Sequence, residues 1–473
     1  MPNPGARRLN LSNSKLSAAS AMLARLTSHS RYARLREDGE SMSGPNSSFH
    51  DSLLLQCRTA GDSTTRLRSS LFSPEFCFLL ACCAWPHSDA RANRLSNALR
   101  TDLDWNEVLR LAERHRVIGL VADAFQHLPG DAVPKLVRAE VTNDSGLLAR
   151  QSLQLACESV RIARVLQDAG IAVAFLKGVP LAVSVYGDLG LRHSRDIDLL
   201  VSEEDAVLAC GVMRSAGYRG ATPAERTIAN EEIQRWLRDN RDIHYVHEKT
   251  GVNVELHVRM FANPLLNEMF DSSCWHSVSM GGGDLVVLKP RELFLYLCLH
   301  GTLHGWFRLK WLADIAVLLA QTSEADRQQL LCTAESSNIA WLVSHAMQMS
   351  SLFFGIPQLE PSRVPNWREK LLTHIALQEI RCPAAPEGLS FRTTRLRLSP
   401  YLFRSDWRYL WLQTRCDFKS EDDRQLLRLP KGSSFLYPIV RPILWTFRRL
   451  LIRGGGLLRA NDKPEVSLNR EQK

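Results

Sequence analysis

The stretch SRDIDLLV at residues 194–201 constrains the chain more than any other part of its sequence. Asp196 and Asp198 stand two residues apart and lead directly into an apolar run that predicts a buried strand. Because alternate side chains of a strand point to the same face, the two carboxylates should lie side by side and repel each other. Either a divalent cation with hard oxygen ligands, Mg²⁺ or Mn²⁺, or an ion pair with Arg192 or Arg195 would relieve that repulsion. The stretch therefore predicts a metal site or an ion-paired strand entry.

A second feature, further upstream, is a strand that ends in a lysine-glycine turn. Residues 172–182 have the sequence AVAFLKGVPLA, in which the apolar run gives way to Lys177 and Gly178, and Pro180 suits the first turn of a helix. Backbone N–H groups at a helix N-terminus can hold a phosphate group together with the Lys177 ammonium. An ordinary strand-to-helix turn has the same pattern, so the segment predicts either a phosphate-binding turn or a simple connection.

A third carboxylate lies downstream on a predicted β-hairpin. Residues 242–247 and 252–258 alternate polar and apolar side chains on either side of a Glu-Lys-Thr-Gly turn, and Glu255 belongs to the second strand. If that strand lies beside the one carrying Asp196 and Asp198, three carboxylates converge near the Lys177 turn. Such a set is what two-metal phosphoryl transfer requires, because the ions activate the attacking oxygen and clamp the phosphate that is displaced.

Together these motifs resemble the uncharacterised nucleotidyltransferase family of the DNA polymerase β-like nucleotidyltransferase superfamily. The resemblance extends over about residues 71–450 and includes a downstream helical motif at residues 297–315. The superfamily usually has Gly-Ser before the carboxylates, whereas this chain has Lys-Gly at a longer separation, a form typical of the narrower family. The matching motifs are Phe-Leu-Lys177-Gly178, Tyr186-Gly187, Arg192, Arg195-Asp-Ile-Asp198-Leu-Leu-Val and Val-Glu255-Leu-His257.

The resemblance implies a fold of the α+β class, a polymerase β-like core of mixed sheet and helices flanked by helical regions. It also implies transfer of a nucleoside monophosphate from a nucleoside triphosphate, with ATP as the expected donor, to an unidentified acceptor with release of pyrophosphate. The implied catalytic residues and ligands of Mg²⁺ or Mn²⁺ are Asp196, Asp198 and Glu255. The implied nucleotide- and phosphate-binding residues are Lys177, Gly178, Arg192 and Arg195.

Several of these residues have a second interpretation. Arg192 and Arg195 can hold phosphates with their forked donors or simply neutralise the two aspartates. Tyr186 can stack on a base, although a single aromatic residue near a helix end is more often part of the core.

Composition narrows the class of protein. The 473 residues are 45% hydrophobic, which is enough for two or three packed units. The 59 basic side chains outnumber the 50 acidic ones and give a net charge of +9, an excess compatible with phosphorylated substrates, nucleic acid or an anionic membrane. The basic residues form no stripe with interleaved aromatic residues, which disfavours nucleic-acid binding. Eleven cysteines without a Cys-x-x-Cys motif, and no secretory signal, predict reduced thiols and a cytoplasmic protein.

The chain is expected to divide into five parts. Residues 1–70, rich in Ser, Arg, Asn and Gly, predict a disordered leader, with an organelle-targeting segment as the alternative. We expect an N-terminal helical region at 71–150, which includes helices at 76–85 and 108–115 with Asp104 as an N-cap, and then the nucleotidyltransferase core at 151–290. A C-terminal helical domain at 291–430 precedes a basic amphipathic helix and polar tail at 431–473.

The C-terminal half carries two further candidates. His300 and His304 stand one helical turn apart, which permits zinc binding with His257 or Asp314 but is more typical of packed histidines. Residues 435–453 mix aromatic and apolar residues with arginines, which predicts a helix docked on the protein or lying on an anionic membrane surface. The alternative function is therefore an inactive nucleotidyltransferase-fold scaffold at a membrane, and the preferred one is an enzyme.

Overall fold

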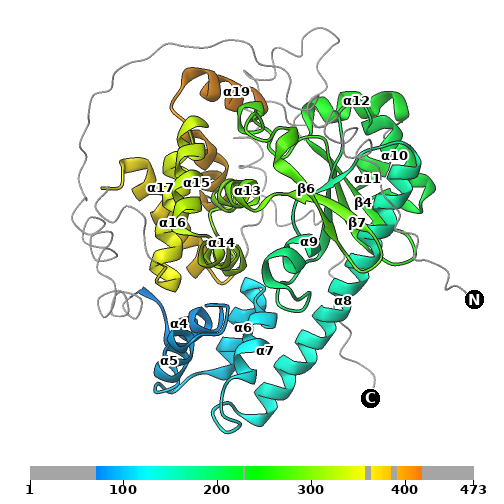
Figure 1. The fold of residues 1–473 in the computed structure, drawn as a ribbon. Coiled ribbons are helices and arrows are strands. Elements are labelled where there is room, and N and C mark those ends of the chain that lie inside the picture. The colour runs from blue at the N-terminus through cyan, green and yellow to red at the C-terminus, as the bar shows by residue number, and fades with distance from the viewer. Residues whose placement is uncertain (1–70, 227–228, 357–363, 385–390, 418–473) are drawn as a thin grey trace, which may run out of the picture. The chain divides into compact units, whose positions relative to one another are not determined.

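A seven-stranded mixed sheet forms the centre of the part of the chain that the computed structural model describes, namely residues 71–226, 229–356, 364–384 and 391–417 (Figure 1). The strand order is β3-β4-β5-β2-β1-β7-β6. This sheet and its many helices confirm the predicted α+β class. The strands are β1 (Ala174–Phe175), β2 (Asp196–Leu200), β3 (Tyr218–Gly220), β4 (Asp242–His247), β5 (Asn253–His257), β6 (Trp275–Ser279) and β7 (Asp284–Leu288).

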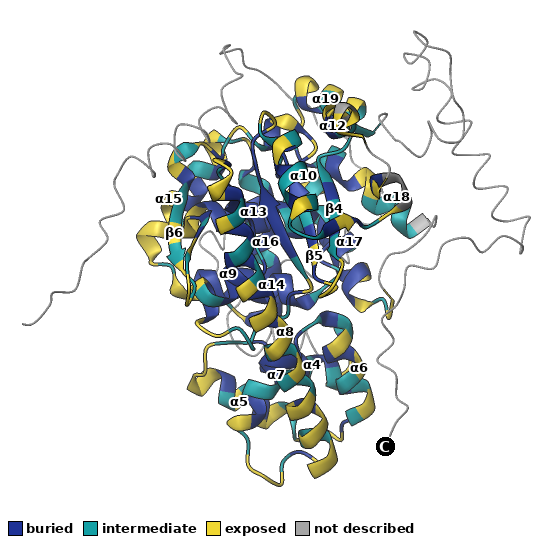
Figure 2. Ribbon diagram, turned by 90° about the vertical axis from the view of Figure 1, so that its right-hand side faces the viewer, coloured by how far each residue is buried: buried dark blue, intermediate teal, exposed yellow. Residues whose placement is uncertain are grey.

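One face of the sheet is apolar and the other is polar, because apolar and polar residues alternate along the strands. Ile197 and Leu199 of β2, and Val254 and Leu256 of β5, join one hydrophobic core with helices α8 (Lys135–Asp168) and α10 (Ala206–Ser215). The residues between them point to the opposite face and carry the charges. Figure 2 shows the strands largely buried beneath helices with exposed outer faces. The apolar alternation thus directs the polar side chains of neighbouring strands to a common surface.

Strand pairing brings the predicted motifs together. β2 and β5 run parallel and place Asp198 opposite Glu255, while β4 and β5 form the antiparallel hairpin predicted from the sequence. β1 pairs with β2 and is only two residues long, so the chain leaves the sheet at Lys177 directly beside β2. The short helical segment after it comprises α9 (Val179–Leu181) and a π-helical turn (Ala182–Tyr186).

Helices precede the sheet, and they differ in extent from the sequence prediction. Asp104 caps α6 as predicted, accepting hydrogen bonds from the backbone N–H groups of Asn106 and Glu107. Ser88 caps the helix that starts at residue 89, because its side chain accepts a hydrogen bond from the backbone N–H of Arg91. α8 begins at Lys135 and packs against α7 as well as against β2 and β7 (Figure 1). These helices are α4 (Pro74–Cys82), α5 (Asp89–Ala98), α6 (Trp105–His115), α7 (Ile118–Gln126) and α8.

Further helices lie between the strands in the sequence and after the last strand. Within the described residues none is both long and apolar enough to span a bilayer. The first compact unit ends at Leu410, and the second begins at Trp411. The predicted leader at 1–70 and the tail helix at 435–453 lie outside the described residues. The remaining helices are α11 (Pro223–Arg226), α12 (Asn230–Asp239), α13 (Pro290–Leu303), α14 (Leu309–Gln321), α15 (Glu324–Ser336), α16 (Ala340–Phe354), α17 (Trp367–Arg381), α18 (Phe391–Leu398) and α19 (Trp407–Asp417), with 3₁₀ turns at Pro264–Leu266, Ser272–Cys274 and Ser399–Leu402.

Candidate active site

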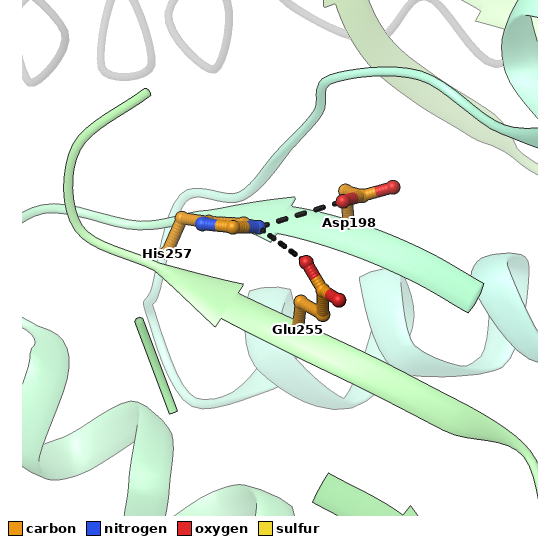
Figure 3. Close-up of side chains that lie close together, drawn as sticks. All are labelled: Asp198, Glu255 and His257. Atoms are coloured by element: carbon orange, nitrogen blue, oxygen red, sulfur yellow. Dashed lines mark ion pairs between the residues drawn. The ribbon is translucent and has the colours of Figure 1, made fainter. Parts of the chain in front are cut away.

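Asp198 and Glu255 form the centre of the candidate site, on the polar face of the two parallel strands (Figure 3). The side chain of Asp198 is only 2% exposed, whereas that of Glu255 is 31% exposed. One carboxylate is therefore buried and the other reaches solvent. The register of β2 and β5 places these two carboxylates next to each other, as the sequence predicted for neighbouring strands.

Lys177 neutralises the buried carboxylate in this structure. Its ammonium group forms an ion pair with Asp198, from the turn that follows β1. Burial would lower the pKa of Lys177, but the charges of Asp198 and Asp196 outweigh it and raise that pKa above its usual value. Conversely, burial would raise the pKa of Asp198, but Lys177 and His257 lower it well below its usual range. Both groups are therefore charged at neutral pH.

His257 lies between the carboxylates at the end of β5, as Figure 3 shows. Its Nε2 is 3.5 Å from Asp198 Oδ1 and 3.4 Å from Glu255 Oε2, and its Nδ1 is 3.2 Å from Asp242 Oδ2. Burial alone would lower the pKa of this imidazole, but the three surrounding carboxylates raise it to about 10. The imidazolium thus adds a second positive charge to the acidic cluster.

A second group of possible metal ligands shares Glu255. Asp242 and His244 of β4 lie beside it, and one ligand atom from each of the three residues falls within 4.8 Å of the others. His244 Nδ1 is also 3.2 Å from Glu225 Oε1, and that contact is the main reason why the pKa of His244 is raised. Among the described residues, the other such group is Asp198, Glu255 and His257.

The two predicted aspartates differ in their contacts. Asp196 begins β2 opposite Asn253 and belongs to neither group of possible metal ligands in the described chain. Its side chain is half-buried, and its charge acts on Lys177 without a direct ion pair. Arg195, next to it, is exposed, and within the described residues it makes no hydrogen bond or ion pair.

Arg192 contacts neither aspartate but forms a buried ion pair with Asp314 of α14. Its Nε is 2.9 Å from Asp314 Oδ1, and its Nη2 is 2.9 Å from Asp314 Oδ2. The remaining Nη1 donates to the Gly178 carbonyl oxygen at 3.3 Å, and Asp314 also accepts a hydrogen bond from the Tyr186 hydroxyl. Arg192 therefore holds the lysine-glycine turn in place, and Tyr186 is a core residue.

Gly178 has φ +82° and ψ −131°, a backbone conformation that is accessible almost only to glycine. A Cβ atom there would lie 3.4 Å from the carbonyl oxygen of Asp196. The glycine thus lets the turn lie close against the start of β2.

His300 and His304 belong to neither group of possible metal ligands described above. Their rings contact each other at 4.6 Å between centroids, and both contact the Trp311 ring. Burial lowers the pKa of His304 to about 3, and it lowers that of His300 as well. These contacts are those of packed, neutral histidines, the second of the two interpretations given in the sequence analysis.

The donor set suits a divalent cation. Asp198 Oδ2 is buried and accepts no hydrogen bond from the described residues, so one oxygen of the central carboxylate has no partner among them. Glu255 offers a second oxygen within the same 4.8 Å group, and His257 would offer a nitrogen once a bound metal ion displaced its proton. Oxygen ligands fit Mg²⁺, and a nitrogen beside them also suits Mn²⁺.

Sequence reasoning missed Asp242 and His244 and gave Asp314 only a minor role. The alternation of the hairpin could have found the first two, because Asp242 pairs with His257 and His244 pairs with Glu255 across the two strands. Nothing local in the sequence relates Asp314 to Arg192, which lies 122 residues earlier.

Comparison with known proteins gives one match. The model of a family described as "Uncharacterised nucleotidyltransferase" matches residues 101–355, which is more than half of the chain. The matched region starts just before α6 and ends just after α16, so it contains the whole sheet. The searches of curated proteins and of solved structures gave no significant match.

Proposed function

Because the chain belongs to the uncharacterised nucleotidyltransferase family, we propose that it transfers a nucleoside monophosphate from a nucleoside triphosphate to an acceptor and releases pyrophosphate. The observation that carries this proposal is the register of β2 and β5, which sets Asp198 against Glu255 beside the Lys177 turn. ATP is the expected donor. The acceptor would approach from the side of Glu255, the carboxylate that reaches solvent.

The proposed metal ligands are Asp198 and Glu255, with Asp196 at the edge of the site and His257 as an added nitrogen donor. A divalent ion there would supply positive charge to the transferred phosphate and favour deprotonation of the attacking oxygen. Lys177 would exchange its contact with Asp198 for the phosphate, since both are anionic partners for one ammonium group. Stabilising the charge on the transferred group would be the main catalytic contribution of these residues.

The remaining residues would position the nucleotide. Gly178 leaves its backbone close to β2, and Arg192 fixes that turn through the Gly178 carbonyl oxygen. Arg192 is thus a positioning residue in this proposal, because its other donors are bound to Asp314. Arg195 is exposed and remains a candidate for direct phosphate contact.

The test is transfer of label from a triphosphate labelled at its α-phosphate, in the presence of Mg²⁺ or Mn²⁺ and a cell extract that supplies acceptors. The wild-type chain should label a product and release pyrophosphate, and Asp196→Asn and Asp198→Asn should lose this activity. Asp196→Asn is the cleaner variant because Asp196 makes no ion pair among the described residues. The exposed Glu140→Gln on α8 is the matched control and should keep full activity. Full activity of the folded Asp198→Asn chain would refute the proposal.

A further inference from the structure

Four basic residues from three distant parts of the chain converge beside the start of β2. Arg116 follows α6, Arg195 precedes β2, and Arg308 and Lys310 lie at the start of α14. Hydrogen bonds join these segments: Lys310 Nζ donates to the His193 carbonyl oxygen at 3.1 Å, and Arg308 Nη1 donates to the Arg114 carbonyl oxygen at 3.2 Å. The backbone of Leu309 also donates to His115 Nδ1 at 3.2 Å. We refer to Arg116, Arg195, Arg308 and Lys310 as the basic cluster.

The basic cluster has almost no acidic partner. In the described residues, none of its four side chains forms an ion pair with a carboxylate. The charge of Asp196 acts on Arg116, Arg308 and Lys310, and that of Asp314, which is ion-paired with Arg192, acts on Lys310 as well. Asp314 is already neutralised by Arg192, so the four basic side chains have Asp196 as their nearby acid without an ion pair in the described residues, which leaves an excess of positive charge at this position.

Burial makes that excess costly in the free protein. Lys310 is only 8% exposed, and its ammonium group has a backbone carbonyl oxygen as its hydrogen-bond acceptor. Burial lowers its pKa well below the usual value, and Arg192 and Arg116 lower it further. Burial and neighbouring arginines likewise lower the pKa of Arg308 to about 9 and that of Arg116 to about 10. An anion bound among these side chains would relieve the repulsion.

The N-terminus of α14 adds to the positive potential. This helix has 13 residues, its N-cap residue is Arg308, and no side chain caps it. Its first turn carries no acidic residue, and Lys310 sits in that turn, where a cation opposes the helix dipole. A helix that begins with two basic residues and no acid favours a negatively charged ligand at this end.

The position of the cluster indicates which ligand. The Gly178 turn lies against Ser194 and the Asp196 carbonyl oxygen, and both belong to the segment that carries Arg195. Glu255, His257 and Asp242 lie on β5 and β4, which are on the opposite side of β2 from β1 and its Lys177 turn. The basic cluster therefore lies at the start of β2, beside the Lys177-Gly178 turn.

We propose that the basic cluster binds the terminal phosphates of the nucleoside triphosphate, an inference that rests on the proposed nucleotidyl transfer. The helices before and after the sheet would thus complete the phosphate site that Lys177 and Gly178 begin. The same groups would hold the pyrophosphate that leaves in the reaction. The negative charge of these phosphates replaces the missing acidic partners.

The experiment measures binding of tripolyphosphate by calorimetry, with EDTA present so that the metal site does not contribute. Arg308→Gln and Lys310→Met should each weaken binding about tenfold, the effect of losing one charge-assisted hydrogen bond. The matched control is Arg235→Gln, which removes an exposed arginine of α12 and should leave the affinity unchanged. Thermal unfolding gives a second readout. Without ligand, Lys310→Met should raise the Tm, because methionine has a volume similar to that of lysine but no ammonium group to bury.

Three results would overturn the inference. Unchanged tripolyphosphate affinity in Arg308→Gln and Lys310→Met is the first, and an equal loss in Arg235→Gln is the second. The third is tripolyphosphate binding that does not compete with ATP, because the cluster would then serve a phosphorylated acceptor instead. If the wild-type chain binds tripolyphosphate but transfers no label, the proposed function alone is refuted. If label transfer depends on Asp198 but the cluster variants have no effect on it or on binding, this inference alone is refuted.

Discussion

A buried ion pair between Arg192 and Asp314 holds residues of the candidate site in position. Arg192 and Asp314 are 4% and 0% exposed, and they hold Gly178 and Tyr186 as well as each other. Such a pair contributes little net free energy relative to apolar residues, but breaking it leaves a charge without a partner. The position of the Lys177-Gly178 turn thus depends on α14, a helix outside the sheet.

Removing the carboxylate tests this dependence. Asp314→Ala should lower the free energy of unfolding by about 3–5 kcal/mol, because the Arg192 guanidinium stays buried without its counter-ion. Chemical denaturation measures the effect. Glu232→Ala, which removes an exposed acid 3.9 Å from Arg235, should cost less than about 1 kcal/mol. Equal costs for the two substitutions would contradict the assigned role of the buried pair.

At the scale of elements, local sequence patterns predicted β2 and the hairpin of β4 and β5. The alternation of residues 242–258 gave the hairpin, and the apolar run after Asp196 gave β2, because a half-buried strand needs a period of two. The alternation also placed Glu255 on the second strand of that hairpin, so that it would join the aspartates if this strand lay beside β2. Their meeting depended on β2 and β5 being neighbours, which the resemblance to the nucleotidyltransferase family made the natural expectation and local patterning could not show.

Helix extents were harder to predict for a physical reason. α8 begins at Lys135 without a side-chain cap, so no start signal stands at its first residue. Its early turns pack on α7, and tertiary packing of this kind supports helix that local propensity leaves undecided. The same limit applies to Arg116 and Arg308, since basic residues 192 positions apart give no sign in the sequence that they converge.

For the molecule as a whole, burial of neutral histidines predicts a loss of stability in acid. Burial lowers the pKa values of His115, His193 and His345 to about 3, against about 6.5 in an unfolded chain. The unfolded state therefore binds more protons below pH 6.5, and stability falls as the pH drops from there toward 3. His257 has the opposite sign: its stabilising charge is fully present below pH 6.5 and is lost as the pH rises toward 10.

A single substitution isolates the acid effect. His345 of α16 lies away from the candidate site, with its Nδ1 3.2 Å from the Thr373 hydroxyl. In His345→Gln, the free energy of unfolding should fall less steeply between pH 6 and pH 4, by about 1.4 kcal/mol per pH unit. Denaturant titrations at several pH values give this slope. A slope identical to that of the wild-type chain would show that His345 does not become protonated on unfolding.

The most direct test of the central claim is calorimetric titration of the chain with a non-hydrolysable nucleoside triphosphate, with and without Mg²⁺ or Mn²⁺. The proposed site predicts binding that requires the metal ion, with little or no binding by the Asp196→Asn/Asp198→Asn double variant. Glu140→Gln should bind as the wild-type chain does. Absence of triphosphate binding by the folded wild-type chain, or equal binding by the double variant, would contradict the assignment of these carboxylates to nucleotidyl transfer.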